Sequence, residues 1–583
     1  MFKRLQPLYP YMRRYRRSFF WGGVSVVLSN LIWIFFPQVI RIAIDDLNQG
    51  VTERKIWMYA GLLVIVSLAK GVFLFLTRWI IIGISREIEF DLRNDLFLQL
   101  EKQAAAYYQQ HRTGDIMARM TNDLNAVRML LGPAIMYSAN TILFSVGALF
   151  FLLKISPFLT LVALVPLPLA SVLVQAMGRK IHERFERIQA MFSDISAQAQ
   201  ENFSGARLVR AFAQEEAQIA AFEKSNKEYI RRALRLVQLM GMLWPTLEFI
   251  LGLAMAITLL VGGHEVLSHR ISVGDFVAFS TYMMMLTWPV IALGWVVNIF
   301  QRGTASVTRI DELLKAEPSI DDRDADSSIP ADIKLRGEIE FRNLNFAYEQ
   351  HEVLHHVSLK IPAGSSLAVV GPTGSGKSTL VSLIARIYDA PSGSILLDCR
   401  PLPDYPLDVL RANIGFVPQE TFLFSETIRG NIAFGCRNAT EDEVKRAAEI
   451  AHIRKEFEEF PHGFETVVGE RGLTLSGGQK QRSALARAVL RDPRILILDD
   501  SLASVDTYTE ERILEELQNV MQGRTTILIS HRISTVRHAD QIAVLIDGRI
   551  SELGTHDELL ERNGHYANLF QKQLLEEELS VAG

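Results

Sequence analysis

The chain has 583 residues, of which 49% are hydrophobic, and a length of this order predicts several domains. Its 61 basic and 65 acidic side chains leave a net charge of −4, so no global basic character points to nucleic acid. The two cysteines, Cys399 and Cys436, have a spacing that fits no metal site, and a reducing cytosol is their natural setting.

Long uncharged apolar runs are concentrated in the first half of the chain. A helix needs about 20 apolar residues to cross the hydrocarbon core of a bilayer. An even number of spans places both termini on one side, and the basic N-terminal segment and the basic segment 178–240 place that side in the cytoplasm. The runs predict six membrane-spanning helices, over residues 18–40, 56–83, 133–153, 157–177, 241–263 and 275–299.

Two long connections between the spans, 84–132 and 178–240, have mixed charge and few helix breakers. We expect each to be a helical hairpin, and about 25 helical residues rise roughly 38 Å, enough to project well beyond the bilayer. Gly114 and Gly205 lie near the middle of the two connections, where a turn is needed. The hairpins are either plain cytoplasmic loops or arms that contact another domain.

Charged residues interrupt the predicted spans, among them Lys70 and Glu248. Ionisable groups in membrane helices are costly and often functional. Two interpretations stay open: a structural one, in which the two residues pair toward the cytoplasmic leaflet, and a role in a substrate cavity. Met284 and Trp288 would add an adaptable apolar wall to such a cavity, although a lipid-facing or packed stripe explains them equally well.

Residues 311–335 are acidic, contain proline and serine, and differ from the sequence on either side. They predict a linker between a transmembrane domain, 1–310, and a soluble α/β domain, 336–583.

The strongest motif of the soluble half is a phosphate-binding loop, G-x-x-x-x-G-K-[ST], which follows the apolar strand 366–370 and precedes the apolar helix 379–387. Its backbone N–H groups and the helix N-terminus favour bound phosphates. Lys377 supplies a positive charge, and Ser378 can ligate Mg²⁺. The residues predicted to bind ATP here are Gly371, Pro372, Thr373, Gly374, Ser375, Gly376, Lys377, Ser378 and Thr379.

A second acidic element, Asp499-Asp500, follows the apolar strand 495–498. A carboxylate at the end of a buried strand can hold Mg²⁺, directly or through water, so Asp499 is the predicted metal-binding residue.

Between these two motifs lies Leu475-Ser-Gly-Gly-Gln479, which resembles the signature motif of ATP-binding cassette (ABC) proteins. Over nearly its whole length the chain resembles a bacterial ABC exporter half-transporter of the multidrug type. The resemblance implies a six-helix all-α transmembrane domain joined to an α/β P-loop NTPase domain, with ATP and Mg²⁺ as cofactors. It also implies a multi-pass protein of the bacterial cytoplasmic (inner) membrane, in contact with lipid and a small hydrophobic substrate.

In this family two cassettes sandwich two ATP molecules, each between the phosphate loop of one chain and the signature of the other. The resemblance therefore implies a second half-transporter as partner. It also implies that the partner's ATP is bound by Leu475, Ser476, Gly477, Gly478 and Gln479.

The resemblance assigns roles to further residues. Tyr348 matches the aromatic residue that stacks on adenine, Gln419 the glutamine that senses Mg²⁺ and the attacking water, and His531 the histidine that contacts the γ-phosphate. Segments 112–119 and 205–212 resemble the two coupling helices, and 469–472 and 501–506 resemble loops that contact the arms and the partner cassette. The candidate coupling residues are Gly114, Asp115, Arg207, Phe212, Glu470 and Asp506.

One residue departs from the family pattern. Most members place glutamate directly after the metal-binding aspartate as general base, whereas this chain has Asp500, which is one methylene shorter. A general base must reach within about 3 Å of its proton. The resemblance therefore favours a heterodimer in which the site of this chain is hydrolytically weak. The alternatives are a homodimer in which Asp500 works more slowly, an exporter of lipid or peptide, and a nucleotide-gated channel or regulatory subunit.

Overall fold

The structure is a computed structural model that describes residues 2–349, 351–436, 438–469, 472, 474–505 and 507–582. The chain divides into two compact units. The first comprises Met1–Glu101 and Thr113–Ala316, and the second Lys102–Arg112 and Glu317–Gly583. The predicted linker begins inside the last helix of the first unit, and the short segment Lys102–Arg112 groups with the second unit.

The first unit is helical, and no strand occurs among its described residues. Within the described chain, six helical stretches are long and apolar enough to cross a membrane, which confirms the predicted number of spans. Each is longer than its apolar run, because the helix continues into charged sequence. The stretches are Arg16–Asn48 (α2), Glu53–Glu101 (α3), Thr113–Ile155, Pro157–Ser204, Glu215–Leu267 (α11) and Val273–Leu314 (α12).

Shorter elements complete this unit. The third stretch is built from α5 (Thr113–Ala118), the π-helical turns η2 (Arg119–Asp123) and η3 (Leu130–Ala134) on either side of α6 (Leu124–Met129), and α7 (Ile135–Ile155). The fourth is built from α8 (Pro157–Leu164) and α9 (Pro166–Ser204). At the N-terminus, η1 (Phe2–Leu8) and α1 (Tyr9–Arg14) precede α2.

Polar groups join the helices inside the apolar bundle of the first unit. The hydroxyl of Tyr282 on α12 donates to the carbonyl of Ile34 on α2 at 2.6 Å and accepts from Gln38 at 3.2 Å. The amide of Asn30 on α2 donates to Asn140 on α7 at 2.7 Å. Interhelical hydrogen bonds of this kind stabilise helix association where water is absent.

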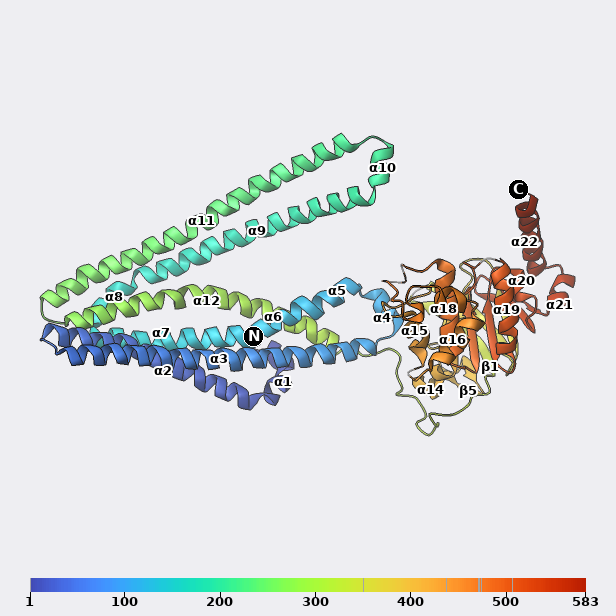
Figure 1. Ribbon diagram of the computed structural model, residues 1–583, viewed down its shortest axis with the longest axis horizontal. Helices are drawn as coiled ribbons and strands as arrows, with labels where there is room; N and C mark the ends of the chain where they lie inside the picture. The colour runs from blue at the N-terminus through green and yellow to red at the C-terminus, as the bar shows by residue number, and fades with distance from the viewer. Residues whose placement is uncertain are drawn as a thin grey trace. The chain divides into compact units, whose positions relative to one another are not determined.

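The second predicted hairpin is present. Helices α9 and α11 run side by side and are joined by α10 (Ala206–Ala211), as Figure 1 shows. Between them, the guanidinium of Arg184 donates to the carbonyl of Arg235 at 3.0 Å. Gly205 ends α9, so the turn lies where the sequence predicted it.

The turn predicted at Gly114 is wrong. Helix α3 ends at Glu101 and is followed by α4 (Ala105–Gln110), whose preceding residue Ala104 is extended, with φ −73° and ψ 162°. Gly114 lies in the first turn of α5, and no atom lies within 4 Å of the position of an added Cβ. Nothing at this position requires glycine, so it is a poor marker of the turn.

The second unit is built on two sheets. Among the described residues, one sheet has the strand order β10-β9-β3-β8-β7-β6 and the other β2-β1-β4-β5. In the first sheet all pairs are parallel except β10 with β9. The strands are β1 (Ile339–Tyr348), β2 (His351–Ile361), β3 (Ser366–Val370), β4 (Ile395–Leu397), β5 (Arg400–Pro401), β6 (Ile414–Val417), β7 (Ile495–Asp499), β8 (Thr525–Ile529), β9 (Gln541–Ile546) and β10 (Arg549–Gly554).

Strands β7 and β8 are buried over their whole length, which is why they appear in the sequence as continuous apolar runs. One apolar cluster fills the space between the two sheets, and a second joins β6 and β7 to the helices after them. The helices of this unit are α13 (Lys377–Ile384), α14 (Leu407–Ala412), α15 (Ile428–Ile432), α16 (Glu441–Ile450), α17 (Arg454–Glu458), α18 (Gly477–Leu490), α19 (Thr507–Met521), α20 (Ile533–Val536), α21 (His556–Glu561) and α22 (His565–Ala582). The predicted fold class, six membrane-length helices plus an α/β P-loop unit, is confirmed.

Candidate nucleotide-binding site

The phosphate-binding loop lies between β3 and α13, at the carboxyl end of the parallel strands. Gly371 has φ +151°, and a Cβ there would lie 2.1 Å from the carbonyl oxygen of Leu545. Gly376 has φ +99° and precedes the first turn of α13. Only glycine tolerates both conformations, so these two residues let the loop wrap round the N-terminus of α13. The unpaired N–H groups of that turn favour an anion.

Lys377 is buried inside this loop, with 7% of its surface exposed. Its ammonium donates to the carbonyl oxygens of Gly371 and Pro372, both at 2.9 Å. Burial lowers the pKa of Lys377, and the carboxylates of Asp499 and Asp500 act in the opposite direction. The positive charge therefore lies inside the loop that the sequence predicts to bind phosphate.

Asp499 ends β7 and is 3% exposed. One of its carboxylate oxygens, Oδ1, is buried without a hydrogen-bond partner, and the side chain of Ser378 hydrogen-bonds to the carboxylate. Burial raises the pKa of Asp499, whereas the bond from Ser378 lowers it. A buried, unpartnered carboxylate oxygen beside a hydroxyl fits Mg²⁺, which prefers oxygen ligands and is usually completed by phosphate and water. No group of three or more His, Cys, Asp or Glu side chains suited to a metal occurs in the part of the chain that is described.

The predicted catalytic residues converge on the same place. Gln419, Asp500 and His531 come from three distant segments and line one cavity of about 180 Å³ with the phosphate-binding loop. Asp500 has φ +46°, and its backbone N–H donates to the carbonyl of Ile529 on β8 at 2.8 Å. The bond ties the residue after β7 to the neighbouring strand, so the start of the Asp500 side chain is fixed.

Tyr348 lies at the end of β1, beside the loop. Its hydroxyl donates to the hydroxyl of Thr379 at 3.2 Å. Its ring makes edge contacts with Phe346 and Tyr388, with 5.0 Å between ring centroids in each case. The structure therefore places the predicted base-stacking residue next to the predicted phosphate site.

The signature residues form the start of α18. The hydroxyl of Ser476 accepts from the N–H of Gln479 at 3.2 Å, and the Gln479 side chain accepts from the N–H of Ser476 at 3.0 Å. This capping box explains why these residue types stand at this spacing. Among the described residues, none of the signature residues lines the 180 Å³ cavity.

The predicted coupling residues are separated by the structure. In the first connection, Asp115 accepts from Arg119 at 3.0 Å within the first unit, and the helix that groups with the nucleotide-binding unit is α4 instead. Gln109 of α4 donates to the hydroxyl of Tyr388 at 2.7 Å, and Gln110 donates to Glu349 at 3.1 Å. Sequence reasoning missed α4, although the uncharged stretch 103–110 between charged neighbours was a usable signal.

In the second connection, Arg207 lies on α10 and Phe212 directly follows it, with 68% of Phe212 exposed. Glu470 and Asp506 lie outside the described residues. The coupling roles stay predictions.

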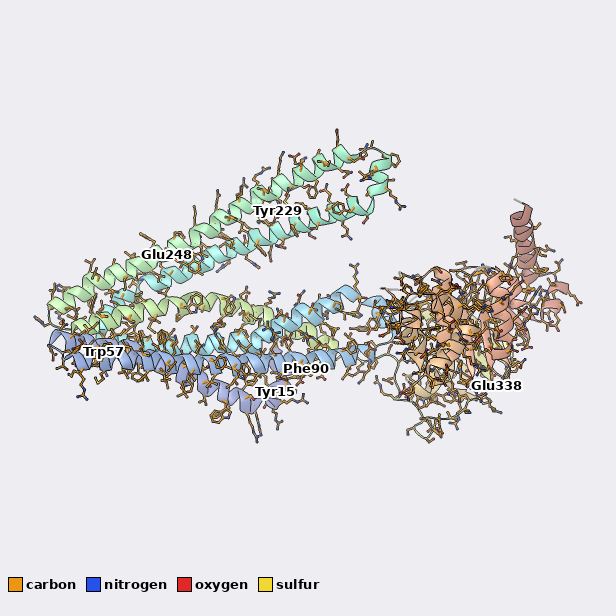
Figure 2. All side chains as sticks on the ribbon, in the orientation of Figure 1. Tyr15, Trp57, Phe90, Tyr229, Glu248 and Glu338 are labelled. Atoms are coloured by element: carbon orange, nitrogen blue, oxygen red, sulfur yellow. The ribbon has the colours of Figure 1, made fainter. Side chains whose placement is uncertain are left out.

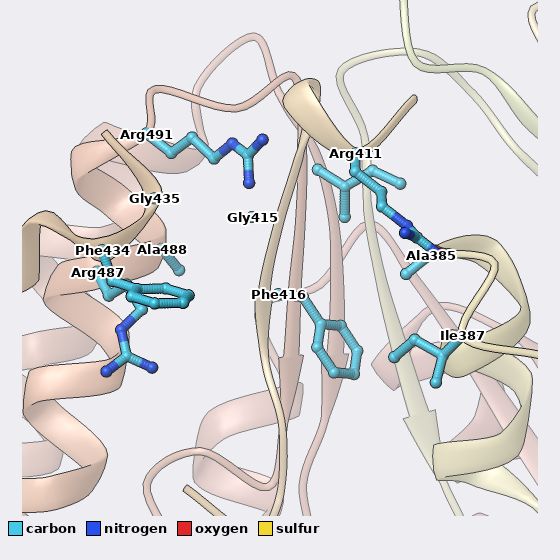
Figure 3. A pocket seen from close by; sticks show the side chains of 11 residues that line it. Ala385, Ile387, Arg411, Gly415, Phe416, Phe434, Gly435, Arg487, Ala488 and Arg491 are labelled. Carbon is cyan, nitrogen blue, oxygen red and sulfur yellow. The ribbon is translucent and has the colours of Figure 1, made fainter. Parts of the chain in front are cut away.

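The nucleotide-binding unit also contains a groove of about 420 Å³ that the sequence did not predict (Figure 3). Phe416 and Phe434 lie on its walls. Arg487 donates to the carbonyl of Asn431 at 2.8 Å, and its guanidinium lies 5.5 Å from the Phe434 ring centroid. Arg411 and Arg491 also line the groove, which is therefore apolar with a basic margin.

The membrane candidates do not form one cluster. The ammonium of Lys70 lies 3.4 Å from the ring centroid of Trp33, a cation–π contact, and in the described chain no contact joins it to Glu248. The predicted pairing is therefore wrong for the described residues, where Lys70 contacts an aromatic ring of α2 instead. Glu248 is exposed on α11 (Figure 2). Met284 and Trp288 are exposed one helical turn apart on α12, 67% and 64% respectively.

A nucleotide site on an α/β unit and six membrane-length helices in the same chain define the class of ATP-hydrolysing membrane transporters with an ATP-binding cassette. Two family models match: ABC transporter transmembrane region over residues 19–290, and ABC transporter over residues 354–503. The chain belongs to the ABC transporter family and is a multi-pass membrane protein of the exporter half-transporter type.

Known relatives are similar over almost the whole chain. One is the probable multidrug resistance ABC transporter ATP-binding/permease protein YheI of Bacillus subtilis, 35% identical over 99% of this chain and 98% of that protein. Another is the ATP-dependent lipid A-core flippase of Syntrophus aciditrophicus, 34% identical over 99% of this chain and 95% of that protein. The solved structure of a bacterial Atm1-family ABC exporter with ATP bound matches with a TM-score of 0.77 at 28% identity, covering 96% of this chain and 98% of that one.

Proposed function

We propose that this chain exports hydrophobic or amphipathic compounds, drugs or lipids, across the bacterial cytoplasmic membrane by alternating access, with both termini in the cytoplasm. We further propose that it acts as one subunit of a heterodimer and that its own phosphate loop lies in a hydrolytically weak site. Two relatives, one named as a probable multidrug resistance protein and one as a lipid A-core flippase, support the substrate class.

Asp500 carries the proposal of a weak site. It lines the 180 Å³ cavity beside Lys377 and His531, where a general base would stand. Aspartate is shorter than glutamate by one C–C bond of about 1.5 Å. Because the Asp500 backbone is hydrogen-bonded to Ile529, the residue cannot move forward to close that gap. Misplacement of a catalytic group by about 1 Å can reduce the rate about 10²-fold.

A second chain is needed because the signature does not reach its own site among the described residues. A partner's signature would cover the nucleotide held by this chain, and residues 475–479 would cover the partner's. In a homodimer both sites would carry aspartate as base. A partner with glutamate would supply one fully active site, and this is the arrangement we favour.

Different residues of this chain would bind the base, the phosphates, Mg²⁺ and the attacking water. Tyr348 would stack on the base, and Lys377 with the first turn of α13 would bind the phosphates. Ser378 and Asp499 would hold Mg²⁺, which neutralises phosphate charge when bound. Gln419, Asp500 and His531 would orient the attacking water. Closure of the two cassettes would exclude bulk water from the site.

Transmission to the membrane helices would pass through α4 and α10. Leu208 and Phe212, on and next to α10, are exposed by 65% and 68%. The 420 Å³ groove with Phe416 and Phe434 is the apolar surface that would receive this segment from the second chain. Charged Arg411 and Arg491 at its margin would bind the acidic residues Glu215 and Glu216, which open α11.

ATP hydrolysis by the purified chain in lipid nanodiscs tests the proposal, beside an Asp500→Glu variant and a co-purified candidate partner half-transporter. The proposal expects little turnover from the chain alone, and restored turnover that depends on the partner's glutamate. A stable homodimer with brisk, drug-stimulated turnover that Asp500→Glu barely changes would contradict the heterodimer. Nucleotide-dependent current without substrate-stimulated ATPase would indicate a channel or regulatory subunit.

A further inference from the structure

Helix α4 is tied to the aromatic cluster around Tyr348 by two neighbouring glutamines. The Gln109 side chain donates to the Tyr388 hydroxyl at 2.7 Å. The Gln110 side chain donates to the carboxylate of Glu349 at 3.1 Å. The Gln109 bond therefore acts on the Tyr348 ring through its neighbour in space, Tyr388. The Gln110 bond acts through Glu349, the next residue in the chain.

The aromatic contacts continue from Tyr388 to the phosphate-binding loop. The rings of Tyr388 and Tyr348 are 5.0 Å apart at an interplanar angle of 85°, and Phe346 makes a similar contact with Tyr348 at 89°. Two perpendicular neighbours restrict the plane of the Tyr348 ring. The Tyr348 hydroxyl then donates to Thr379 at 3.2 Å, so an unbroken chain of contacts runs from α4 to the helix that follows the loop.

The backbone beside Tyr348 is also constrained. Glu349 has φ +52°, a left-handed conformation that a non-glycine residue adopts only at some cost. The bond from Gln110 stabilises the carboxylate of this residue. A cavity of about 630 Å³ lies against the same residues and is lined by Ala106, Gln109, Gln110, Tyr348, Glu349 and Tyr388, among others. The aromatic cluster therefore borders an open space and is positioned from one side by α4.

We propose that Gln109 and Gln110 are positioning residues for the base end of the nucleotide site, and that α4 thereby responds to the base and not only to the phosphates. A ring that is already oriented loses less conformational freedom when a base stacks on it, so the two bonds strengthen ATP binding. By linkage, a stacked base must strengthen the docking of α4 by the same factor. The inference rests on the part of the proposed function that assigns Tyr348 to the base.

The test compares ATP with tripolyphosphate, which has no base and occupies the phosphate loop alone. Dissociation constants are measured by isothermal titration calorimetry on the full-length chain in lipid nanodiscs with Mg²⁺. Loss of one hydrogen bond changes an equilibrium constant by about two- to tenfold. We expect Tyr388→Phe and Gln109→Leu each to raise the Kd for ATP by that factor and to leave the Kd for tripolyphosphate unchanged. The double variant, Gln109→Leu with Tyr388→Phe, should have the same Kd for ATP as each single variant, because each of the three lacks the Gln109–Tyr388 hydrogen bond.

A charge exchange provides a rescue. Gln110→Glu places two carboxylates together and should weaken ATP binding, and Gln110→Glu with Glu349→Lys should restore it by forming an ion pair. Hydrogen exchange of residues 104–111 provides a second readout, independent of activity. ATP should increase the protection of this segment, tripolyphosphate should not, and Tyr388→Phe should abolish the difference.

Equal effects of Tyr388→Phe on both ligands, or no effect on either, would overturn the inference. Tyr348→Ala separates it from the proposed function. If Tyr348→Ala weakens ATP binding and Tyr388→Phe does not, the base assignment stands and the role of α4 is refuted. If Tyr348→Ala changes neither Kd, the base assignment itself fails, and the inference fails with it.

Discussion

Asp45, near the end of α2, caps the first turn of α12: its carboxylate accepts a hydrogen bond from the backbone N–H of Gly274 at 2.8 Å. The hydroxyl of Ser272 donates to the same carboxylate at 2.8 Å, and Arg41 forms an ion pair with Asp275 at 2.7 Å. The first N–H groups of a helix have no partner within the helix, so a cap supplied by another helix joins the two firmly. The close approach requires glycine, because a Cβ at Gly274 would lie 2.3 Å from the carbonyl oxygen of Arg41.

We therefore expect Gly274→Ala to destabilise the protein, since the new methyl group must displace the backbone of α2. Overpacking costs about 1–3 kcal/mol, and loss of the cap in Asp45→Ala about 1–2 kcal/mol. Thermal unfolding in lipid nanodiscs measures both. Gly252→Ala is the matched control, because it lies on a membrane-length helix with no atom within 4 Å of its added Cβ. Equal unfolding temperatures for the two glycine variants would contradict this prediction.

Nucleotide binding should depend on pH through Lys377. Burial lowers the pKa of its ammonium in the free site, and bound phosphates would raise it again. At a pH between the pKa of Lys377 in the free site and its pKa in the ATP complex, binding of ATP therefore takes up a proton. The affinity for ATP consequently falls as the pH rises through the pKa of Lys377 in the free site. Calorimetric titrations from about pH 7 to about pH 10 measure this slope, since an unperturbed lysine titrates near 10.4. Lys377→Arg keeps its charge over this range, so its affinity, although weaker, should show no such fall.

Asp499→Asn should stabilise the nucleotide-free protein and remove its response to Mg²⁺. The buried carboxylate has an unpartnered oxygen, and burial raises its pKa. A raised folded-state pKa means that the ionised form opposes folding, so this group's contribution to stability declines as pH rises from the unfolded value, about 3.9, to the folded one. At neutral pH the neutral amide removes that cost. The unfolding temperature of the nucleotide-free protein should therefore rise, and the further increase caused by Mg²⁺–ATP should shrink. A fall in the nucleotide-free value would show that the charge is already compensated.

Phe212 should matter for coupling and not for nucleotide binding. In the transporting complex, Phe212→Asp should reduce substrate stimulation of ATP hydrolysis several-fold, because an anionic side chain would not enter the apolar part of the groove. The Kd for ATP should stay unchanged. Leu267→Ala, at another exposed apolar position at the end of α11, serves as control. If Phe212→Asp and Phe434→Ala in the groove have additive effects, the two surfaces do not meet.

Local patterns predicted the elements of both units well. The runs that predicted six spans lie within the six membrane-length stretches, and strand β3 has the bounds expected from its apolar sequence. Hydrophobicity over a window and the glycines of a phosphate loop are local properties, so the sequence expresses them directly. The turn assigned to Gly114 failed because a glycine marks a turn only where φ or space requires one.

By itself, the sequence determined the class of protein and the phosphate-binding loop, and it predicted a metal-binding role for Asp499 and a weak site at Asp500. Tertiary structure alone decided which residues meet: Gln419, Asp500 and His531 in one cavity, Lys70 on Trp33, and α4 against the Tyr348 cluster. The reason is physical. Backbone conformation and burial follow from neighbours in the chain, whereas a contact between residues far apart depends on how whole helices and sheets pack, and that packing is the sum of many weak interactions that no single motif contains.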